Sequence, residues 1–517
     1  MIKNFKWLLL VSLTFVACSS DDEAGIDPNS SDGLPLTAGT ADFSKYVAVG
    51  NSLTAGYSDG ALFIAGQEGS YPNLLSQRFA LVGGGEFQIP FMNDNVGGLL
   101  LGGFQIQGPR LYFNGTGPLP VSGTPTTEVS NILTGPYNNM GVPGAKSFHL
   151  VAPGYGNVAG VASGSSNPYF VRFASSPGTT VLADAFAQSP TFFSLWIGNN
   201  DVLSYATSGG TGTNQAGNLD PTTYGGNDIT DPNVFASVYS TLVNQLTAGG
   251  AKGVVANIPY VTSVPFFTTV PTNPIPGLPS ASAGQLNTLF GGINAALAGA
   301  SLPPRFVTLV ADDGNPATVE SNPLLIKDES LPNISAQITA ALTPVLGGAT
   351  AGYVGSIYGQ ARHASNAVAS RDYILLTARS IIGTTQTGAP SPFNSIGVSY
   401  PMQDNTTLTA SETAEVKTAT DAYNATILAL ANSKELAFVD ANAALNQVAN
   451  GGLVYNGYTM TSAYVTGNSF SLDGVHPSPK GYALIANKFL EAINAKYGSN
   501  FKGVNLGQYQ ILFPAML

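Results

Sequence analysis

Short runs of apolar, β-prone residues recur along the chain, and each ends abruptly at Gly, Asn or Pro. The runs are nearly continuous rather than alternating, which is typical of strands that are buried on both faces in a parallel sheet. The runs that we expect to be strands are residues 46–49, 191–197, 253–258 and 436–440, with 372–376 as a further candidate.

Helical periodicity fills several of the intervals between these runs. It predicts helices over residues 231–248, 410–434 and 479–497. Strands that alternate with helices predict a layered α/β domain. Ligands bind to such domains beyond the carboxyl ends of the strands, so functional side chains are expected just after strands.

The remaining segments are rich in loop-forming residues, since the chain has 60 Gly and 34 Pro. Residues 80–135 and 205–230 are interpreted as loop insertions, and residues 260–370 as a larger insertion with some helix. The sequence shows no firm boundary between these segments. We therefore treat residues 41–517 as a single domain with insertions.

Charge is scarce in this chain. Charged residues make up 9% of it, against about 25% in an ordinary globular protein. The net charge is -11, and no block of Lys and Arg follows the N-terminal segment. Because binding to phosphate backbones needs clustered positive charge, we expect no nucleic-acid partner.

The N-terminal segment predicts export. Lys3 and Lys6 precede an apolar run over residues 7–17 that is too short to span a bilayer comfortably. Cys18 follows directly, and the segment resembles a bacterial lipoprotein signal. The resemblance implies that residues 1–17 are removed and that Cys18 is lipidated. The alternative is an ordinary signal peptide with an accidental Cys.

The residues after Cys18 are polar and rich in Gly, Pro and Asp, which predicts a flexible tether over residues 18–40. The acidic start of this segment resembles tethers that carry lipoproteins to the cell surface. No second apolar segment approaches the length of a membrane span. We expect an outer-membrane lipoprotein of the cell envelope, on either the periplasmic or the outer surface, that meets the membrane only through its lipid.

Cysteine and histidine are both rare. Cys18 is the sole cysteine, which excludes a disulfide within the chain and a zinc site built from cysteines. The histidines are His149, His363 and His476. Any chemistry that depends on histidine must use one of these three.

Two polar motifs directly follow predicted strands. Ser52 comes after the run at residues 46–49 and a Gly-Asn pair, which places its hydroxyl at the end of the sheet. Asn200 lies in a Gly-Asn-Asn-Asp motif after the run at residues 191–197, where its side-chain N–H could face an oxyanion. Taken singly, the first motif also fits a helix cap and the second an ordinary turn.

A third motif holds an acid and a base in one loop before the last predicted helix. Asp473 and His476 are three residues apart in the sequence Asp-Gly-Val-His-Pro. The carboxylate could fix the imidazole tautomer and leave the other ring nitrogen free to take a proton from a serine. Seen alone, His476 could also be a surface residue beside a helix start.

Together these motifs resemble the conserved blocks of the SGNH hydrolases, also called the GDSL esterase/lipase family. Residues 50–57, 198–201 and 473–477 match three blocks, and residues 139–145 match the remaining glycine block, all in family order. The resemblance implies a three-layer α/β/α flavodoxin-like sandwich with a mainly parallel sheet. One departure is Asn51, since the family usually has Asp before the nucleophile.

The resemblance also implies an activity: a serine esterase with a Ser52–His476–Asp473 triad that works through an acyl-enzyme. The oxyanion would be held by the backbone N–H groups of Ser52 and Gly144 and by Asn200, with Gly141 in reserve. No metal or organic cofactor is implied. The substrate would be an ester, whether a lipid, an acetylated glycan or a small molecule.

Several alternatives remain beside this hypothesis. Ser58 lies in a Gly-x-Ser-x-Gly motif typical of another hydrolase class, but it follows its strand by several residues. Asp440 ends a predicted strand and could also orient His476, while His149 and His363 lack an acid at useful spacing. The chain could instead be a non-catalytic surface lipoprotein that binds a glycan or a protein partner on the same fold.

Overall fold

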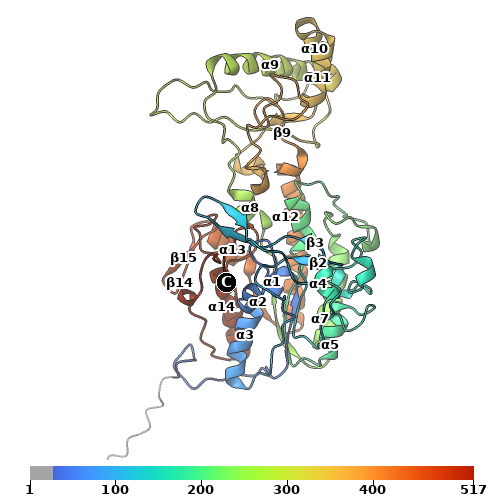
Figure 1. Cartoon of the computed structure of the whole chain (residues 1–517), viewed down its shortest axis with the longest axis vertical. Coiled ribbons are helices and arrows are strands. Elements are labelled where there is room, and N and C mark those ends of the chain that lie inside the picture. The colour runs from blue at the N-terminus through green and yellow to red at the C-terminus, as the bar shows by residue number, and fades with distance from the viewer. Residues whose placement is uncertain (1–26) are drawn as a thin grey trace, which may run out of the picture.

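The computed structural model describes residues 27–517, and a parallel β-sheet lies at the centre of its larger lobe (Figure 1). The sheet has five strands in the order β6-β1-β7-β8-β13, and every neighbouring pair is parallel. The strands are β1 (Tyr46–Gly50), β6 (Asn139–Gly141), β7 (Phe192–Trp196), β8 (Lys252–Ala256) and β13 (Ala437–Val439).

Helices flank this sheet. Every residue of β1 and of β7 is buried, so both faces of the sheet are covered. The expected α/β architecture with a parallel sheet is therefore confirmed. The helices of this lobe include α1 (Ser52–Ala55), α2 (Ile64–Glu68), α3 (Tyr71–Phe79), α4 (Pro168–Val171), α5 (Val181–Ala187), α6 (Asn200–Thr207), α7 (Pro232–Thr247), α12 (Ala410–Ser433), α13 (Ala441–Ala449) and α14 (Pro479–Tyr497).

The apolar runs predicted four of the five sheet strands, and β6 is the strand that they missed. Its sequence, Asn-Met-Gly, has no apolar run, but it pairs with β1 from Ala48 to Gly50. The candidate at residues 372–376 does not join the sheet. There, β11 (Tyr373–Ile374) pairs antiparallel with β12 (Thr407–Leu408), so this apolar run belongs to a separate two-stranded sheet.

The three predicted helices match α7, α12 and α14 to within one residue at each end. Side-chain caps explain where they begin. Asp231 accepts hydrogen bonds from the backbone of Asn233 and Val234 at the start of α7. Ser478 accepts one from Gly481 at the start of α14.

A second lobe rises above the sheet and is joined to it near α8 (Pro265–Thr268) and the start of α12 (Figure 1). It contains much of the expected insertion at residues 260–370 and has apolar clusters of its own, which draw on residues as far as Met402. Its elements are α9 (Ser280–Gly299), α10 (Ser335–Leu346), α11 (Gly348–Tyr358), β9 (Leu325–Lys327) and β10 (Ala361–His363).

Small antiparallel hairpins complete the fold. Two of them lie within the expected insertion at residues 80–135, and the third lies between α13 and α14. They are β2 (Leu99–Leu101) with β3 (Phe104–Gln107), β4 (Leu111–Phe113) with β5 (Pro118–Pro120), and β14 (Leu453–Tyr455) with β15 (Tyr458–Met460).

The predicted signal segment, Cys18 and the first part of the predicted tether lie outside the described residues. The described part of the tether runs along the C-terminal region of the chain. The backbone of Ser31 donates to the carbonyl of Asn500 at 2.8 Å, and the backbone of Thr37 donates to the Asn500 side chain at 2.8 Å. Within residues 27–517, none of the helices combines the length and the apolar character that a membrane span needs.

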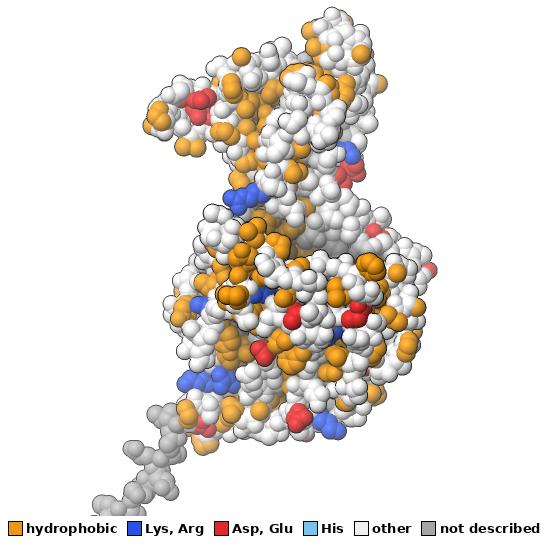
Figure 2. Space-filling model, viewed as in Figure 1, with side chains coloured by type: hydrophobic (Ala, Val, Ile, Leu, Met, Phe, Trp, Pro, Cys, Tyr) orange, Lys and Arg blue, Asp and Glu red, His pale blue; other side chains and the backbone are white. Residues whose placement is uncertain are grey.

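Charged side chains are sparse on the visible surface. Figure 2 shows only scattered acidic and basic groups among white and apolar atoms on this face. This appearance agrees with the low charged content of 9%.

Gly141, at the end of β6, brings that strand into close contact with α1. A Cβ atom at this position would lie 2.3 Å from the backbone nitrogen of Ala55. The absence of a side chain therefore lets α1, which begins at Ser52, pack directly on the sheet.

We expect Gly141→Ala to lower the free energy of unfolding by about 1–3 kcal/mol, because backbone atoms that cannot rotate away must shift. Gly249→Ala is the matched control, since a Cβ there meets nothing within 4 Å. Urea denaturation of both variants measures the difference. Equal stability of the two variants would show that the contact between β6 and α1 is not tight.

Candidate active site

The carboxyl end of β1 delivers Ser52 to the edge of the sheet. Asn51 caps α1, as its Oδ1 accepts the backbone N–H of Leu53 at 3.0 Å. Ser52 is the first residue of α1, so its own N–H has no partner within the helix. Among the described residues this N–H makes no hydrogen bond, and it remains available to a ligand.

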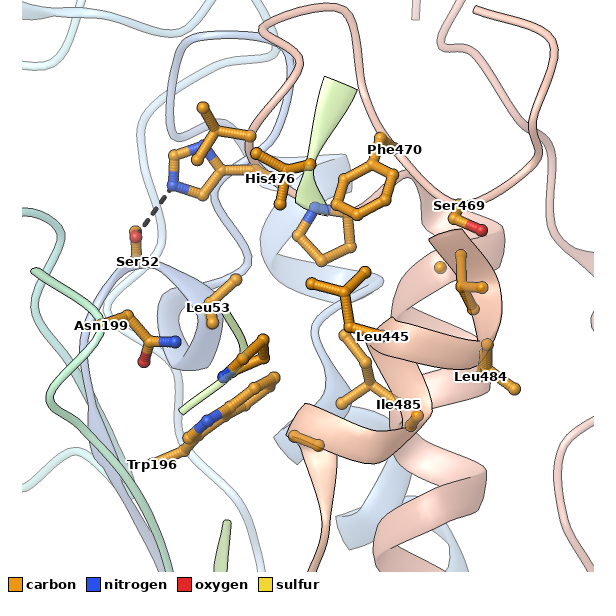
Figure 3. A pocket seen from close by; sticks show the side chains of 18 of the residues that line it. Ser52, Leu53, Trp196, Asn199, Leu445, Ser469, Phe470, His476, Leu484 and Ile485 are labelled. Atoms are coloured by element: carbon orange, nitrogen blue, oxygen red, sulfur yellow. Dashed lines mark hydrogen bonds between the residues drawn. The ribbon is translucent and has the colours of Figure 1, made fainter. Parts of the chain in front are cut away.

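Ser52, His476 and Asp473 lie together in the structure. The Oγ atom of Ser52 is 2.9 Å from Nε2 of His476, as the dashed line in Figure 3 marks. Nδ1 of His476 is 2.8 Å from Oδ2 of Asp473. The three side chains thus form a continuous chain of hydrogen bonds from a hydroxyl through an imidazole to a carboxyl group.

The surroundings of Asp473 favour its ionised form. Burial by itself raises the pKa of this carboxyl, but the charge of His476 and hydrogen bonds from His476 and Val475 outweigh burial and hold the pKa at about 2. The ionised carboxylate accepts a hydrogen bond from Nδ1 of His476. This favours the tautomer of the imidazole ring that carries its proton on Nδ1. Nε2 is then left as the acceptor for the hydroxyl of Ser52.

A loop that directly follows α1 holds the acid–base loop in place. The backbone N–H of Gly60 donates to Oδ2 of Asp473 at 3.0 Å, and Oδ1 of Asp59 accepts the N–H of Leu472 at 2.8 Å. The Tyr57 ring lies against the His476 ring with a centroid distance of 4.6 Å. The segment from Tyr57 to Gly60, called the clamp loop below, thus contacts both members of the acid–base pair.

Ser58, the alternative nucleophile, belongs to this clamp loop. It is 1% exposed, and its hydroxyl donates to the carbonyl of Pro477 at 3.1 Å. The structure therefore separates it from the strand-to-helix turn that a nucleophile elbow requires. The Gly-x-Ser-x-Gly motif marks Ser58 in the sequence, but its contact with the histidine loop could not be predicted, because no local signal connects residues 58 and 477.

Asn200 lies at the start of α6, where β7 ends. Its Nδ2 donates to the carbonyl of Ala145 at 2.9 Å, and the second hydrogen of this amide remains available. The neighbouring Asp201 is fully buried and accepts hydrogen bonds from the backbone and the hydroxyl of Ser147, at 2.8 and 2.7 Å. These contacts join the start of α6 to the loop that follows β6.

The two candidate glycines are Gly141, at the end of β6, and Gly144, in the loop that follows. They differ in whether their N–H groups are already hydrogen-bonded. Gly144 has a φ of 80°, and its N–H makes no hydrogen bond among the described residues. The N–H of Gly141 donates to Oδ1 of Asn139 at 3.0 Å. The N–H of Gly141 is thus already engaged, and Gly144 is the better candidate for a free donor.

Asn51, the departure from the family pattern, links two strand ends. Its Nδ2 donates to Oδ1 of Asn199 at 3.3 Å. An Asp at this position has no proton to donate when ionised. The Asn51 amide therefore acts as the donor in this contact between the ends of β1 and β7, a role that an ionised carboxylate could not take.

The remaining titratable candidates lie elsewhere. Asp440 caps α13 and accepts from Asn257 at 2.8 Å, so it does not orient His476. His149 accepts the backbone N–H of Lys146 through Nδ1 at 3.0 Å. His363 lies in β10 of the upper lobe and accepts the N–H of Val307 at 2.9 Å. His363 is buried and His149 is partly buried, and desolvation lowers the pKa of each to about 4.

A cavity opens beside Ser52 and His476, with Asn51, Asn199 and Asn200 at the same end. Figure 3 shows Leu53 and Trp196 on one side of this cavity and Leu445 and Ile485 on the other. Its volume is about 140 Å³. A reacting group at Ser52 would therefore meet polar atoms at one end and apolar walls beyond.

Within residues 27–517, one group of acidic side chains is close enough to hold a metal ion. It consists of Asp312, Asp313 and Glu320 in the upper lobe, and both aspartates are exposed. It lies outside the set of residues that lines the cavity at Ser52.

Asp59 makes the clamp loop sensitive to pH. Burial raises the pKa of its carboxyl to about 7, and the charge of Asp473 acts in the same direction. Oδ2 of Asp59 has no hydrogen-bond partner among the described residues. The hydrogen bond from Leu472 and the charge of Arg110 lower the pKa of this carboxyl, but burial outweighs both. The neutral form of Asp59 is the one that the folded protein favours.

Because the pKa of Asp59 is higher in the folded chain, the stability that its neutral form contributes is present at low pH and is lost as pH rises through about 7. Asp59→Asn keeps the acceptor for Leu472 and cannot ionise. Between pH 5 and pH 8, its free energy of unfolding should gain roughly 2 kcal/mol relative to the wild type. Urea denaturation at several pH values tests this, and parallel pH profiles would contradict it.

Comparison with protein-family models, with curated proteins and with solved structures finds no match to this chain.

Proposed function

We propose that this protein is a serine hydrolase that cleaves carboxylic esters, with Ser52 as nucleophile, on a fold of the SGNH hydrolase type. The observation that carries the proposal is the hydrogen-bonded series Asp473–His476–Ser52, which ends beside a cavity. A base within hydrogen-bond reach of a hydroxyl, itself oriented by a carboxylate, is the arrangement that activates a serine.

In the first step, His476 takes the proton of Ser52 through Nε2 while Oγ bonds to the ester carbonyl carbon. The carbonyl oxygen becomes an oxyanion. Asp473, which stays ionised because its pKa is about 2, stabilises the imidazolium. When the bond from carbon to the alcohol oxygen breaks, His476 gives its proton to the leaving alcohol.

In the second half, water attacks the acyl group on Ser52 and His476 accepts a proton from that water. The bond between the acyl carbon and Oγ then breaks, and the proton returns to Oγ. The products are a carboxylic acid and the regenerated enzyme, so ester and water are converted to acid and alcohol.

Three donors are proposed for the oxyanion: the N–H groups of Ser52 and Gly144 and the side chain of Asn200. Both backbone groups lack a hydrogen-bond partner among the described residues, and Asn200 uses one amide hydrogen on Ala145. Ser52 and Asn200 line one cavity, which supports a shared role. Ala145 directly follows Gly144, so the hydrogen bond from Asn200 to the Ala145 carbonyl connects Asn200 to the loop that contains Gly144.

The parallel sheet supports the finer fold assignment, a three-layer α/β/α sandwich of flavodoxin type. The candidate residues follow β1, β6 and β7 in the order of the family blocks. We further propose that the protein is anchored in the cell envelope by a lipid on Cys18. In this proposal the protein binds an ester substrate, and it contacts the membrane only through the lipid.

Ser52→Ala is expected to abolish hydrolysis of a short-chain 4-nitrophenyl ester and covalent labelling by a fluorophosphonate probe. Removal of a nucleophile in such a triad costs about 10⁶-fold in kcat. Ser58→Ala is the matched control and should retain labelling. The Ser58 hydroxyl donates a hydrogen bond to the carbonyl of Pro477 and is not proposed to attack the ester. Equal rates in the wild type and Ser52→Ala would refute the nucleophile assignment, and a wild-type protein that never reacts would favour a binding function.

Asn200→Ala should lower kcat for the same ester by about 10²–10³-fold with little change in KM, since an oxyanion donor acts mainly in the transition state. Steady-state kinetics separates the two constants. A rise in KM with kcat unchanged would assign Asn200 to substrate binding instead.

A further inference from the structure

The cavity beside Ser52 has a distinctive construction. Beyond the catalytic end, two helices supply most of the wall on one side (Figure 3). Each contributes residues at the helical spacing i, i+3, i+4 and i+7, so one face of each helix is turned towards the cavity. These residues are Ala441, Ala444, Leu445 and Val448 of α13, and Gly481, Leu484, Ile485 and Lys488 of α14.

The opposite wall is also apolar. Leu53 follows Ser52 directly, and the indole of Trp196 lies deeper in the cavity (Figure 3). Other apolar residues complete the lining: Leu203, Pro259, Val261, Val264, Val439, Phe470, Val475, Pro477 and Phe489. The wall therefore offers continuous hydrocarbon contact from the nucleophile inward.

Polar atoms in the deeper lining are already engaged. Nε1 of Trp196 donates to the carbonyl of Asn257 at 3.0 Å. Nζ of Lys488 pairs with Glu491 at 2.9 Å, so its apolar stem is the part suited to the cavity. The hydroxyl of Ser469 donates to the carbonyl of Gly467 at 3.4 Å.

A sugar ring in this space would lose its hydrogen bonds to water and find few new ones. Buried polar groups without partners are costly, whereas buried methylene groups are favourable. The deeper cavity thus discriminates against hydroxylated groups and favours an aliphatic chain. The polar residues Asn51, Asn199 and Asn200 remain at the end where the ester group would react.

We infer that this cavity binds the acyl chain of the ester, and that the preferred chain is aliphatic and of medium length. The inference rests on the proposed function. The acyl group stays bonded to Ser52 after the alcohol has left, so an interior cavity beside Ser52 suits the group that remains. The departing alcohol needs a path to solvent instead.

The cavity volume sets the length of the chain. At about 140 Å³, it is similar to an apolar protein cavity of about 150 Å³ that holds one benzene molecule. Benzene has six carbons, so we assign a chain of roughly six carbons to the cavity. An acetyl group would leave most of this space unused, and a palmitoyl chain would exceed it.

The test is a series of 4-nitrophenyl esters with acetyl, butyryl, hexanoyl, octanoyl and palmitoyl groups, assayed with the full mature chain. From acetyl to hexanoyl, kcat/KM should rise by about three- to fourfold per methylene, as expected for burial of hydrocarbon. Beyond octanoyl it should stop rising. A rate that is flat with chain length, or greatest for acetyl, would overturn the inference.

A second series keeps the acetyl group and lengthens the alcohol from ethyl to hexyl. We expect kcat/KM to change much less in this series. A rise confined to the alcohol series would overturn the assignment of the cavity to the acyl chain. Ser52→Ala should abolish hydrolysis of every ester, so a failure of the proposed function is distinguishable from a failure of the chain-length inference.

Ala444→Phe provides a structural test, because it adds a ring to the face of α13 that lines the cavity. It should lower the ratio of hexanoyl to acetyl kcat/KM by at least tenfold. Ala443→Phe is the matched control on the same helix, since Ala443 is exposed and lies outside the lining. If the two variants have the same ratio, the cavity does not select the chain.

Discussion

The hydrogen bonds between the clamp loop and the acid–base loop are the contacts on which the candidate site depends. The bond from Gly60 to Asp473 joins positions 413 residues apart. Because the clamp loop follows α1 directly, the same short stretch that positions Ser52 also holds Asp473 and His476. The proposed nucleophile and its proposed base are thus placed by one segment, and a shift of that segment moves both side chains together.

The parallel sheet explains why the polar end of the cavity at Ser52 and its apolar part lie side by side. Strands β1, β7 and β13 all end at one edge, where each is followed by a helix that lines the cavity. The first residues of α1 and α6 are Ser52 and Asn200, while the faces of α13 and α14 that line the cavity are mainly apolar. In the proposed function, chemistry and substrate selection therefore use the same edge of the sheet but different parts of the elements that follow the strands.

Around the site, buried polar groups join segments to one another. Asp201 ties the start of α6 to Ser147, and Asn51 ties the end of β1 to Asn199. Each bond spans elements that are distant in sequence. A buried group of this kind is costly when unpaired, so it strongly favours one arrangement of the loops. Asp59 is the exception, since one of its oxygens lacks a partner.

The sequence by itself determined the α/β class, four of the five sheet strands, three long helices and the candidates Ser52, Asp473 and His476, because periodicity and turn residues are local signals. It could not determine β6, whose Asn-Met-Gly sequence is a strand only because β1 lies beside it. Tertiary structure alone decided that Ser58 holds the histidine loop and that Gly141 packs against α1. It alone brought the apolar faces of α13 and α14 together beside Ser52, because contacts between distant segments leave no mark in local sequence.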